Sequence, residues 1–130
     1  MARSPPVKVF LVDDSPEVLQ SVSQFLRETP GIEMVGVALS GEEALPQLAR
    51  VKPDVVLMDL SMPGMGGLEA TRRIKAGAAP ALVLLLSLYD AGLFADDVSA
   101  CGADGYLGKA QIGEHLVPLI LSLTRETDHA

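Results

Sequence analysis

The sequence contains a single cysteine, Cys101, and only two histidines, His115 and His129. One cysteine cannot form a disulfide within the chain, and no group of Cys and His residues has metal-ligand spacing. The sequence therefore excludes a disulfide framework and a Cys/His metal site. A chain of this kind suits a reducing compartment, and we expect it in the cytoplasm.

Long apolar runs are also missing. The longest, ALVLLLSL at 81–88, has the length of a buried strand, whereas a membrane-spanning helix needs about 20 apolar residues. The N-terminal MARSPP leads into VKVFLV, which contains a lysine and lacks both a long apolar region and a small-residue cleavage site. We expect neither a membrane segment nor a signal peptide.

Positive charge is scarce. The chain has 17 acidic and 10 basic side chains, a net charge of −7 and a pI near 4.6. This balance argues against binding to nucleic acid phosphates or anionic lipid. If the protein controls DNA, another segment must make the contact.

Apolar segments of strand length alternate with helical patterns along the 130 residues, a length suited to one domain. We expect strands at 7–13, 32–38, 54–59, 81–87 and 105–109. Helices are expected after Ser15 as far as Pro30, after Ser40, over 68–76, around 93–101 and over 112–124. This alternation predicts a single doubly wound α/β domain, a parallel sheet with helices on both faces. Residues 1–6 and 125–130 are expected to be tails flanking a domain over 7–124.

Two helix starts have clear signals, and two prolines do not fit. Ser15 before Pro16 predicts an N-cap and a first-turn proline, and Ser40 with Glu43 has capping-box spacing. Pro46 should kink the second helix because it removes a backbone hydrogen bond. Pro118 lies inside the last expected helix, and nothing in the sequence explains it.

Polar residues stand at four of the five strand ends. Asp13 and Asp14 close the first strand, Asp59 ends the third, Ser87 the fourth and Lys109 the fifth. In a doubly wound fold, ligands bind outside the carboxyl ends of the strands. Converging carboxylates repel one another unless a cation joins them, and oxygen donors of this kind suit Mg²⁺ with a phosphate oxygen.

The same residues suggest phosphoryl transfer. Lys109 supplies a positive charge and Ser87 a hydroxyl, which can hold a phosphoryl oxygen as charge develops. The sequence has no Gly-rich P-loop, GxSxG or Cys/His pair, so the best nucleophile available is a carboxylate. The first interpretation of Asp59 is therefore that it attacks phosphorus.

Each of these residues alone also has a structural interpretation. Asp13 and Asp14 could favour the start of the first helix through their charge, and Asp59 could form a turn with the following loop. Ser87 and Lys109 could be ordinary solvated side chains. Their joint occurrence at successive strand ends favours a site.

The sequence resembles the receiver domains of bacterial response regulators over about residues 7–124. The resemblance rests on LVDDSP, DVVLMDLSMPGMGGLEA, the serine that ends LVLLLS, and CGADGYLGK. It implies a five-stranded sheet in the order 2-1-3-4-5 and a phospho-acceptor at Asp59. It also implies that Asp14, Asp59 and the Ser61 carbonyl hold Mg²⁺, with Asp13 assisting through water.

The resemblance further implies how the signal enters and leaves. A sensor histidine kinase would donate the phosphoryl group, Lys109 would pair with it, Ser87 would move toward it, and Tyr106 would change rotamer. The surface of the fourth helix, fifth strand and fifth helix would then change. The family catalyses only its own phosphorylation and dephosphorylation. GADGYLGK is similar to receivers that precede LuxR-type helix-turn-helix domains, which would lie outside this chain and regulate transcription.

Several residues depart from the family pattern. Leu88 stands where a smaller residue is common and would restrict access, Gly108 and Ala110 flank Lys109 in unusual fashion, and Gly113 and Pro118 weaken the last helix. A phosphorylation-independent interaction module and a Mg²⁺-dependent small-molecule phosphatase or phosphotransferase remain alternatives. The oligomeric state is open between a monomer and a phosphorylation-linked homodimer.

Overall fold

The computed structural model describes residues 5–77, 81–88 and 95–128. One sheet holds five parallel strands, in the order β2-β1-β3-β4-β5. The strands are β1 (Val7–Val12), β2 (Ile32–Ala38), β3 (Val55–Asp59), β4 (Leu82–Ser87) and β5 (Gly105–Gly108). The fold class and strand order are confirmed. Four strands differ from the expected ranges by one residue at one end.

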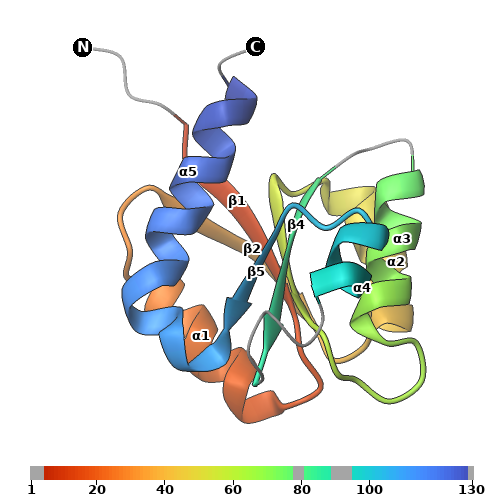
Figure 1. Cartoon of the computed structure of the whole chain (residues 1–130). Coiled ribbons are helices and arrows are strands. Elements are labelled where there is room, and N and C mark those ends of the chain that lie inside the picture. Colours follow the sequence, from red (N-terminus) through yellow and green to blue (C-terminus); the bar gives the residue numbers. More distant parts are fainter. Residues whose placement is uncertain (1–4, 78–80, 89–94, 129–130) are drawn as a thin grey trace.

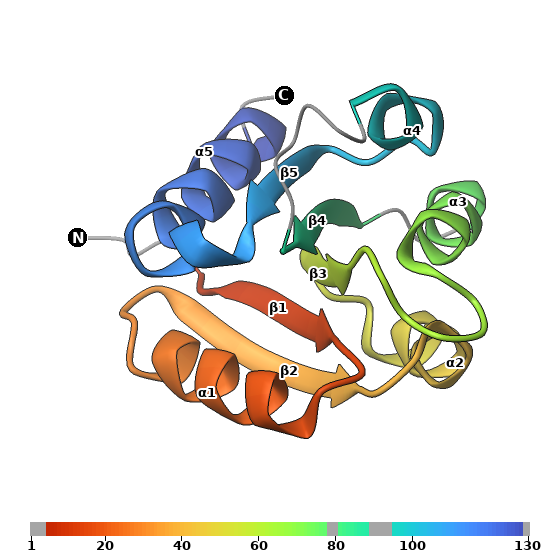
Figure 2. The ribbon, with the colours of Figure 1, turned by 60° about the horizontal axis from the view of Figure 1, so that its bottom comes forward.

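Helices cover both faces of the sheet (Figures 1 and 2). One face carries α1 (Pro16–Arg27) and α5 (Val117–Asp128); the other carries α2 (Gly41–Val51), α3 (Gly67–Ala76) and α4 (Ala95–Ala100). The central strands are apolar on both sides because both sides are buried. In β1, Val9 and Leu11 pack under α1 and α5, whereas Phe10 and Val12 pack under the other helices.

The two expected helix caps are present. The Ser15 hydroxyl accepts a hydrogen bond from the Val18 N–H at 3.3 Å, and the Ser40 hydroxyl accepts one from the Glu43 N–H at 3.0 Å. Helix α2 continues through Pro46 as far as Val51. The cap signals therefore located both helix starts correctly.

The last helix differs from the expectation. A 3₁₀ turn, η2 (Lys109–Gln111), and a π turn, η3 (Ile112–Leu116), precede α5, which reaches Asp128. A uniform helix over 112–124 is therefore wrong at both ends. Pro118 is the second residue of α5 and lies just after the π turn. It interrupts no uniform helical ladder there, because the bonding pattern already changes at this junction.

Only part of the expected fourth helix lies within the described residues. Val98 and Cys101 pack against the core under α2, α3 and α4, as expected, whereas Leu93 and Phe94 lie outside the described residues. Gly102 follows with a φ of +87°, a conformation typical of the residue that ends a helix. None of the helices described is long and apolar enough to cross a bilayer.

Candidate functional site

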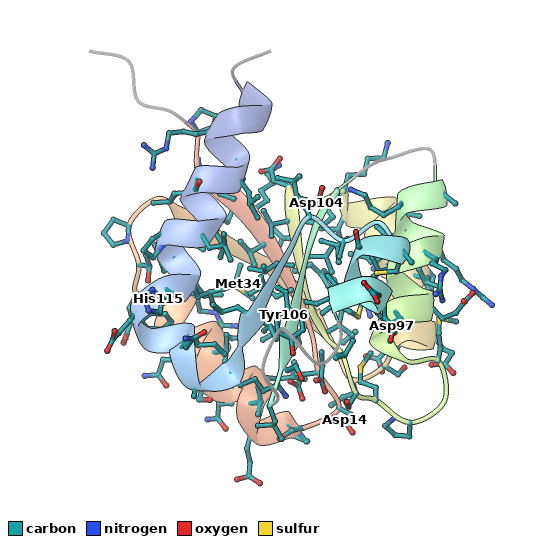
Figure 3. All side chains as sticks on the ribbon, in the orientation of Figure 1. Asp14, Met34, Asp97, Asp104, Tyr106 and His115 are labelled. Atoms are coloured by element: carbon teal, nitrogen blue, oxygen red, sulfur yellow. The ribbon has the colours of Figure 1, made fainter. Side chains whose placement is uncertain are left out.

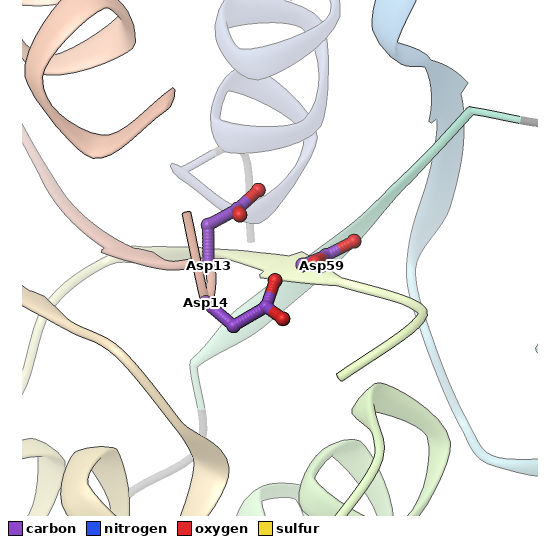
Figure 4. Close-up of side chains that lie close together, drawn as sticks. All are labelled: Asp13, Asp14 and Asp59. Atoms are coloured by element: carbon purple, nitrogen blue, oxygen red, sulfur yellow. The ribbon is translucent and has the colours of Figure 1, made fainter. Parts of the chain in front are cut away.

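Strands β1 and β3 bring three aspartates to the carboxyl edge of the sheet. Asp13 and Asp14 directly follow β1, and Asp59 is the last residue of β3. The two strands are hydrogen-bonded neighbours, so their ends meet. One carboxylate oxygen from each aspartate lies within 4.8 Å of the other two. Figure 4 shows the three side chains close together.

Local hydrogen bonds fix these carboxylates. Asp13 Oδ1 accepts from the Ser15 N–H at 2.9 Å, which holds the side chain in a short turn before α1. Asp59 Oδ1 accepts from the Ser61 N–H at 3.4 Å. Asp13 and Asp59 are buried, with 1% and 4% of their surfaces exposed, whereas Asp14 is exposed. The cluster therefore has two buried carboxylates and one at its mouth.

Lys109 joins the two buried carboxylates. It follows β5, and its Nζ lies 2.8 Å from Asp13 Oδ2 and 3.3 Å from Asp59 Oδ1. Only 16% of the lysine side chain is exposed. The sequence prediction that Lys109 belongs with the aspartates is consistent with these contacts, across a separation of 96 residues.

Burial and repulsion set the charge state of Asp59. Burial, followed by the charge of Asp13, raises the pKa of Asp59 from 3.8 to about 6, although Lys109 and the Ser61 N–H oppose the shift. Burial lowers the pKa of Lys109, but the hydrogen bonds and charges of Asp13 and Asp59 outweigh it, so the net pKa is raised. At neutral pH, Asp59 is ionised and Lys109 is protonated.

The donor set fits a hard divalent cation. Three carboxylates within 4.8 Å of one another carry up to three negative charges, and Lys109 compensates only one. Mg²⁺ prefers oxygen ligands and retains several waters, which an exposed ligand such as Asp14 allows. Ser61 is exposed and turns back toward Asp59 through its N–H.

Ser87 and Tyr106 lie on the neighbouring strands. Ser87 ends β4, is buried, and is paired in register with Gly108, the residue before Lys109. Tyr106 is half-buried in β5, opposite Leu85, and packs against the core under α2, α3 and α4. Figure 3 shows Tyr106 near the middle of the molecule. The pairing with Gly108 places Ser87 at the same edge of the sheet as Lys109, and its role in the site stays a prediction.

Two residues that depart from the receiver sequence pattern, Leu88 and Gly108, leave the geometry of the site undisturbed. Leu88 is 80% exposed, so it is not packed over the aspartates. Gly108 has an ordinary extended conformation, and a Cβ there would meet no atom closer than 3.7 Å. Lys109 therefore reaches Asp13 without needing a glycine before it.

Two close contacts near the site were not predicted from the sequence. Gly67 begins α3 so close to β3 that a Cβ there would lie 2.2 Å from the Asp59 carbonyl oxygen. Glu42, in the first turn of α2, accepts a hydrogen bond from the Met65 N–H at 3.1 Å. The paired glycines Gly66 and Gly67, at the start of α3, were a usable signal for close packing. Nothing local marks Glu42.

The family model described as the response regulator receiver domain matches residues 9–120. The response regulator UvrY of Escherichia coli K12 is 38% identical over 117 residues, which cover 90% of this chain and 54% of UvrY. The chain thus spans about half the length of the curated relative it matches.

Solved structures agree with the family match. The receiver domain of the putative response regulator NarL from Mycobacterium tuberculosis has a TM-score of 0.87 at 30% identity, covering 94% of this chain and 98% of that one. A LuxR-family two-component response regulator from Aurantimonas sp. SI85-9A1 has a TM-score of 0.85 at 33% identity, covering 91% and 84%. This chain belongs to the family of response regulator receiver domains.

Proposed function

We propose that this receiver domain is a switch that accepts a phosphoryl group on Asp59. The observation that carries the proposal is the position of Asp59, a buried carboxylate at the end of β3 between Asp13, Asp14 and Lys109. Its pKa near 6 leaves it ionised, and therefore nucleophilic, at neutral pH.

The donor we propose is the phosphohistidine of a sensor histidine kinase. A carboxylate oxygen of Asp59 forms a bond to phosphorus, the phosphorus–nitrogen bond breaks, and the electron pair leaves with the imidazole, which takes up a proton. The Lys109 ammonium binds a phosphoryl oxygen in place of its contact with Asp59. It therefore balances charge that the carboxylates would otherwise repel.

We propose that Mg²⁺ supports this step, held by Asp14, Asp59 and the Ser61 carbonyl, with Asp13 assisting through water. When bound, Mg²⁺ supplies the positive charge that offsets the carboxylates and the incoming phosphate. Asp13 also keeps the Lys109 ammonium beside Asp59 through its 2.8 Å contact. Asp14 lies at the exposed mouth, where ligand exchange is easiest.

The response that we propose runs from Asp59 to Ser87 and then to Tyr106. Ser87 turns its hydroxyl toward the phosphoryl group, and the Tyr106 ring takes another rotamer. The neighbouring strand positions of these two residues support this order. The surface formed by α4, β5 and α5 would differ between the two states.

We also propose that the domain spans residues 7–124, lies in the cytoplasm and acts on no substrate other than its own aspartyl phosphate. Its family and its likeness to a LuxR-family regulator favour an output in transcription, through a DNA-binding domain outside this sequence. The net charge of −7 argues against DNA contact by the receiver itself. The domain would be either a monomer or a homodimer whose assembly is linked to phosphorylation.

The test is the intact mass after incubation with Mg²⁺ and acetyl phosphate, with Asp59→Asn as the control. We expect wild type to gain one base-labile phosphoryl group and the variant none. No gain by wild type, with Mg²⁺ binding demonstrated separately, would favour a phosphorylation-independent module. Turnover of a generic phosphomonoester that Asp59→Asn abolishes would favour an enzyme.

A further inference from the structure

Glu42 links α2 to the connection between β3 and α3. It belongs to the first turn of α2, and its Oε2 accepts a hydrogen bond from the Met65 N–H at 3.1 Å. Met65 lies in residues 60–66, which connect β3 to α3 and which we call the acceptor loop. Because the loop begins immediately after Asp59, its conformation decides where Ser61 and the start of α3 lie.

Backbone hydrogen bonds fix the two ends of the acceptor loop, one to β4 and one across the loop itself. The Leu60 N–H donates to the Leu86 carbonyl at 2.8 Å, and the Gly67 N–H donates to the Leu60 carbonyl at 3.1 Å. The contact between Glu42 and Met65 adds a third tie from outside the loop, 23 residues away in sequence. It holds the second half of the loop, close to the start of α3.

The backbone leaves room for this third tie. Gly64 has a φ of +74°, and a Cβ there would lie 2.8 Å from Glu42 Oε2. Gly41 packs against Met65, where a Cβ would lie 3.2 Å from the sulfur. Both glycines therefore allow α2 and the acceptor loop to approach closely enough for Glu42 to reach the Met65 N–H.

Electrostatics favour the same arrangement. The N-cap residue of α3 is Gly66, which provides no side-chain hydrogen bond. The Glu42 carboxylate brings a negative charge close to this helix start, where the helix dipole favours an anion. Gly67, next in the chain, packs directly on the Asp59 carbonyl. A shift at the start of α3 is therefore transmitted to the backbone of Asp59.

We infer that Glu42 is a positioning residue for phosphorylation of Asp59: by bonding the Met65 N–H, it holds the acceptor loop and the start of α3 in the geometry that the site uses. The inference rests on the proposed function, because the reaction it serves is the phosphorylation proposed for Asp59. Glu42 itself touches neither the carboxylate cluster nor the phosphoryl group.

Glu43 provides a matched control. It is also exposed, belongs to the same helical turn and carries the same charge. Within the described part of the chain, its carboxylate has no hydrogen bond or ion pair; its backbone N–H donates to Ser40, and its carbonyl accepts from the Gln47 side chain. Glu42→Ala and Glu43→Ala therefore remove the same charge near α2, but only the first removes the tie.

Two further variants separate the effect of side-chain length from the effect of charge. Glu42→Asp keeps the negative charge but is one methylene shorter, so its carboxylate falls short of the Met65 N–H. Glu42→Gln loses the charge but retains an oxygen that can accept the hydrogen bond. If the bond itself is what matters, Glu42→Asp resembles Glu42→Ala, and Glu42→Gln resembles wild type.

The experiment measures two quantities for all four variants and for wild type. The first is the amide hydrogen exchange rate at Met65, and the second is the rate of phosphorylation by acetyl phosphate across a Mg²⁺ titration. We expect Glu42→Ala and Glu42→Asp to exchange at Met65 about 10-fold faster than wild type, since one hydrogen bond is lost. We expect their phosphorylation to be about 5-fold slower, because a loop that moves holds the site in its reactive geometry for less of the time.

Glu43→Ala and Glu42→Gln should keep at least about half of the wild-type rate. Equal phosphorylation rates for Glu42→Ala and Glu43→Ala would overturn the inference, and so would a Glu42→Gln as slow as Glu42→Ala. If Glu42→Ala fails to fold, Glu42→Asp replaces it in the same two measurements, and a wild-type rate for Glu42→Asp would then overturn the inference. Absence of phosphorylation in wild type would reject the proposed function; the exchange rates at Met65 would then still decide whether Glu42 orders the loop.

Discussion

Lysine and aspartate meet at both ends of the sheet, in different ways. At the carboxyl edge, Lys109 lies between Asp13 and Asp59, and all three side chains are largely buried. At the amino edge, Lys75 Nζ lies 2.8 Å from Asp104 Oδ2, and about a quarter of each side chain is exposed. Figure 3 shows Asp104 and Asp14 toward opposite ends of the strands.

The two groups differ in how their charges balance. Asp104 Oδ2 also accepts from the Val83 N–H at 2.8 Å, and Lys75 also donates to the Ala81 carbonyl at 3.1 Å, so the amino-edge pair joins α3, β4 and the start of β5. At the carboxyl edge, one lysine faces two buried carboxylates, with a third nearby. At the amino edge, the charge of Asp104 is balanced by that of Lys75. The carboxyl edge keeps an excess of negative charge, which a cation can balance.

The largest expected effect comes from removing each lysine. In a chelating buffer at neutral pH, we expect Lys109→Met to lower the free energy of unfolding by about 3 kcal/mol, because two buried carboxylates lose their counter-charge. Lys75→Met should cost about 1 kcal/mol, since its pair is partly solvated. Urea unfolding measures both. Equal losses would mean that the two ends do not differ in the way described.

The pH dependence of Asp59 sharpens the comparison. Folded Asp59 has a pKa of about 6, above its ordinary value of 3.8, so the folded protein holds this proton to a higher pH than the unfolded chain. The contribution that protonated Asp59 makes to the free energy of unfolding is therefore complete below about pH 4, and it is lost as the pH rises through about 6. Without metal, we expect the free energy of unfolding of Asp59→Asn to be about 2 kcal/mol higher than that of wild type at neutral pH. Near pH 4 the two proteins should differ little in stability.

The matching change at the amino edge should have the opposite sign. Asp104→Asn weakens two hydrogen bonds to a carboxylate, so we expect it to lose about 1 kcal/mol at neutral pH. Unfolding curves in urea at several pH values compare both variants with wild type. An Asp59→Asn protein less stable than wild type at neutral pH would contradict the charge excess at the carboxyl edge.

Mg²⁺ should stabilise the carboxyl edge alone. At ten times its dissociation constant, it should raise the free energy of unfolding by about 1.4 kcal/mol, because it binds only the folded protein. Mg²⁺ should stabilise Asp104→Asn by as much as wild type, and it should stabilise Asp59→Asn by less. Thermal unfolding with Mg²⁺ and with chelator provides the comparison. The same gain in all three proteins would place the ion away from Asp59.

Much of the fold could be predicted from local patterns. The strand order follows the family resemblance, and the helix starts at Ser15 and Ser40 follow from side-chain caps that act within three residues. The start of the last helix was not predictable in this way. The apolar spacing after Ile112 suits an α-helix, whereas the structure begins with a 3₁₀ turn and a π turn. Packing against the sheet, which periodicity does not report, decides between these bonding patterns.

The candidate site was predictable in its membership but not in its internal arrangement. Asp13, Asp14, Asp59, Ser87 and Lys109 stand at strand ends in the sequence, and parallel strands carry such residues to one edge. That Lys109 lies closer to Asp13 than to Asp59, and that Gly67 touches the Asp59 carbonyl, depends on distances between elements. No nearby residue in the sequence marks Glu42, because its partner is the backbone N–H of Met65, 23 residues away in the connection between β3 and α3.

By itself, the sequence determined the alternation of strands and helices, because burial on both faces demands apolar strands and amphipathic helices at fixed periods. It also determined which chemical groups follow each strand. Only the tertiary structure decided the raised pKa of Asp59, the lysine shared by two carboxylates and the tie from Glu42 to Met65. These properties arise from burial and from contacts across long separations, and such free energies exist only when the elements have packed together.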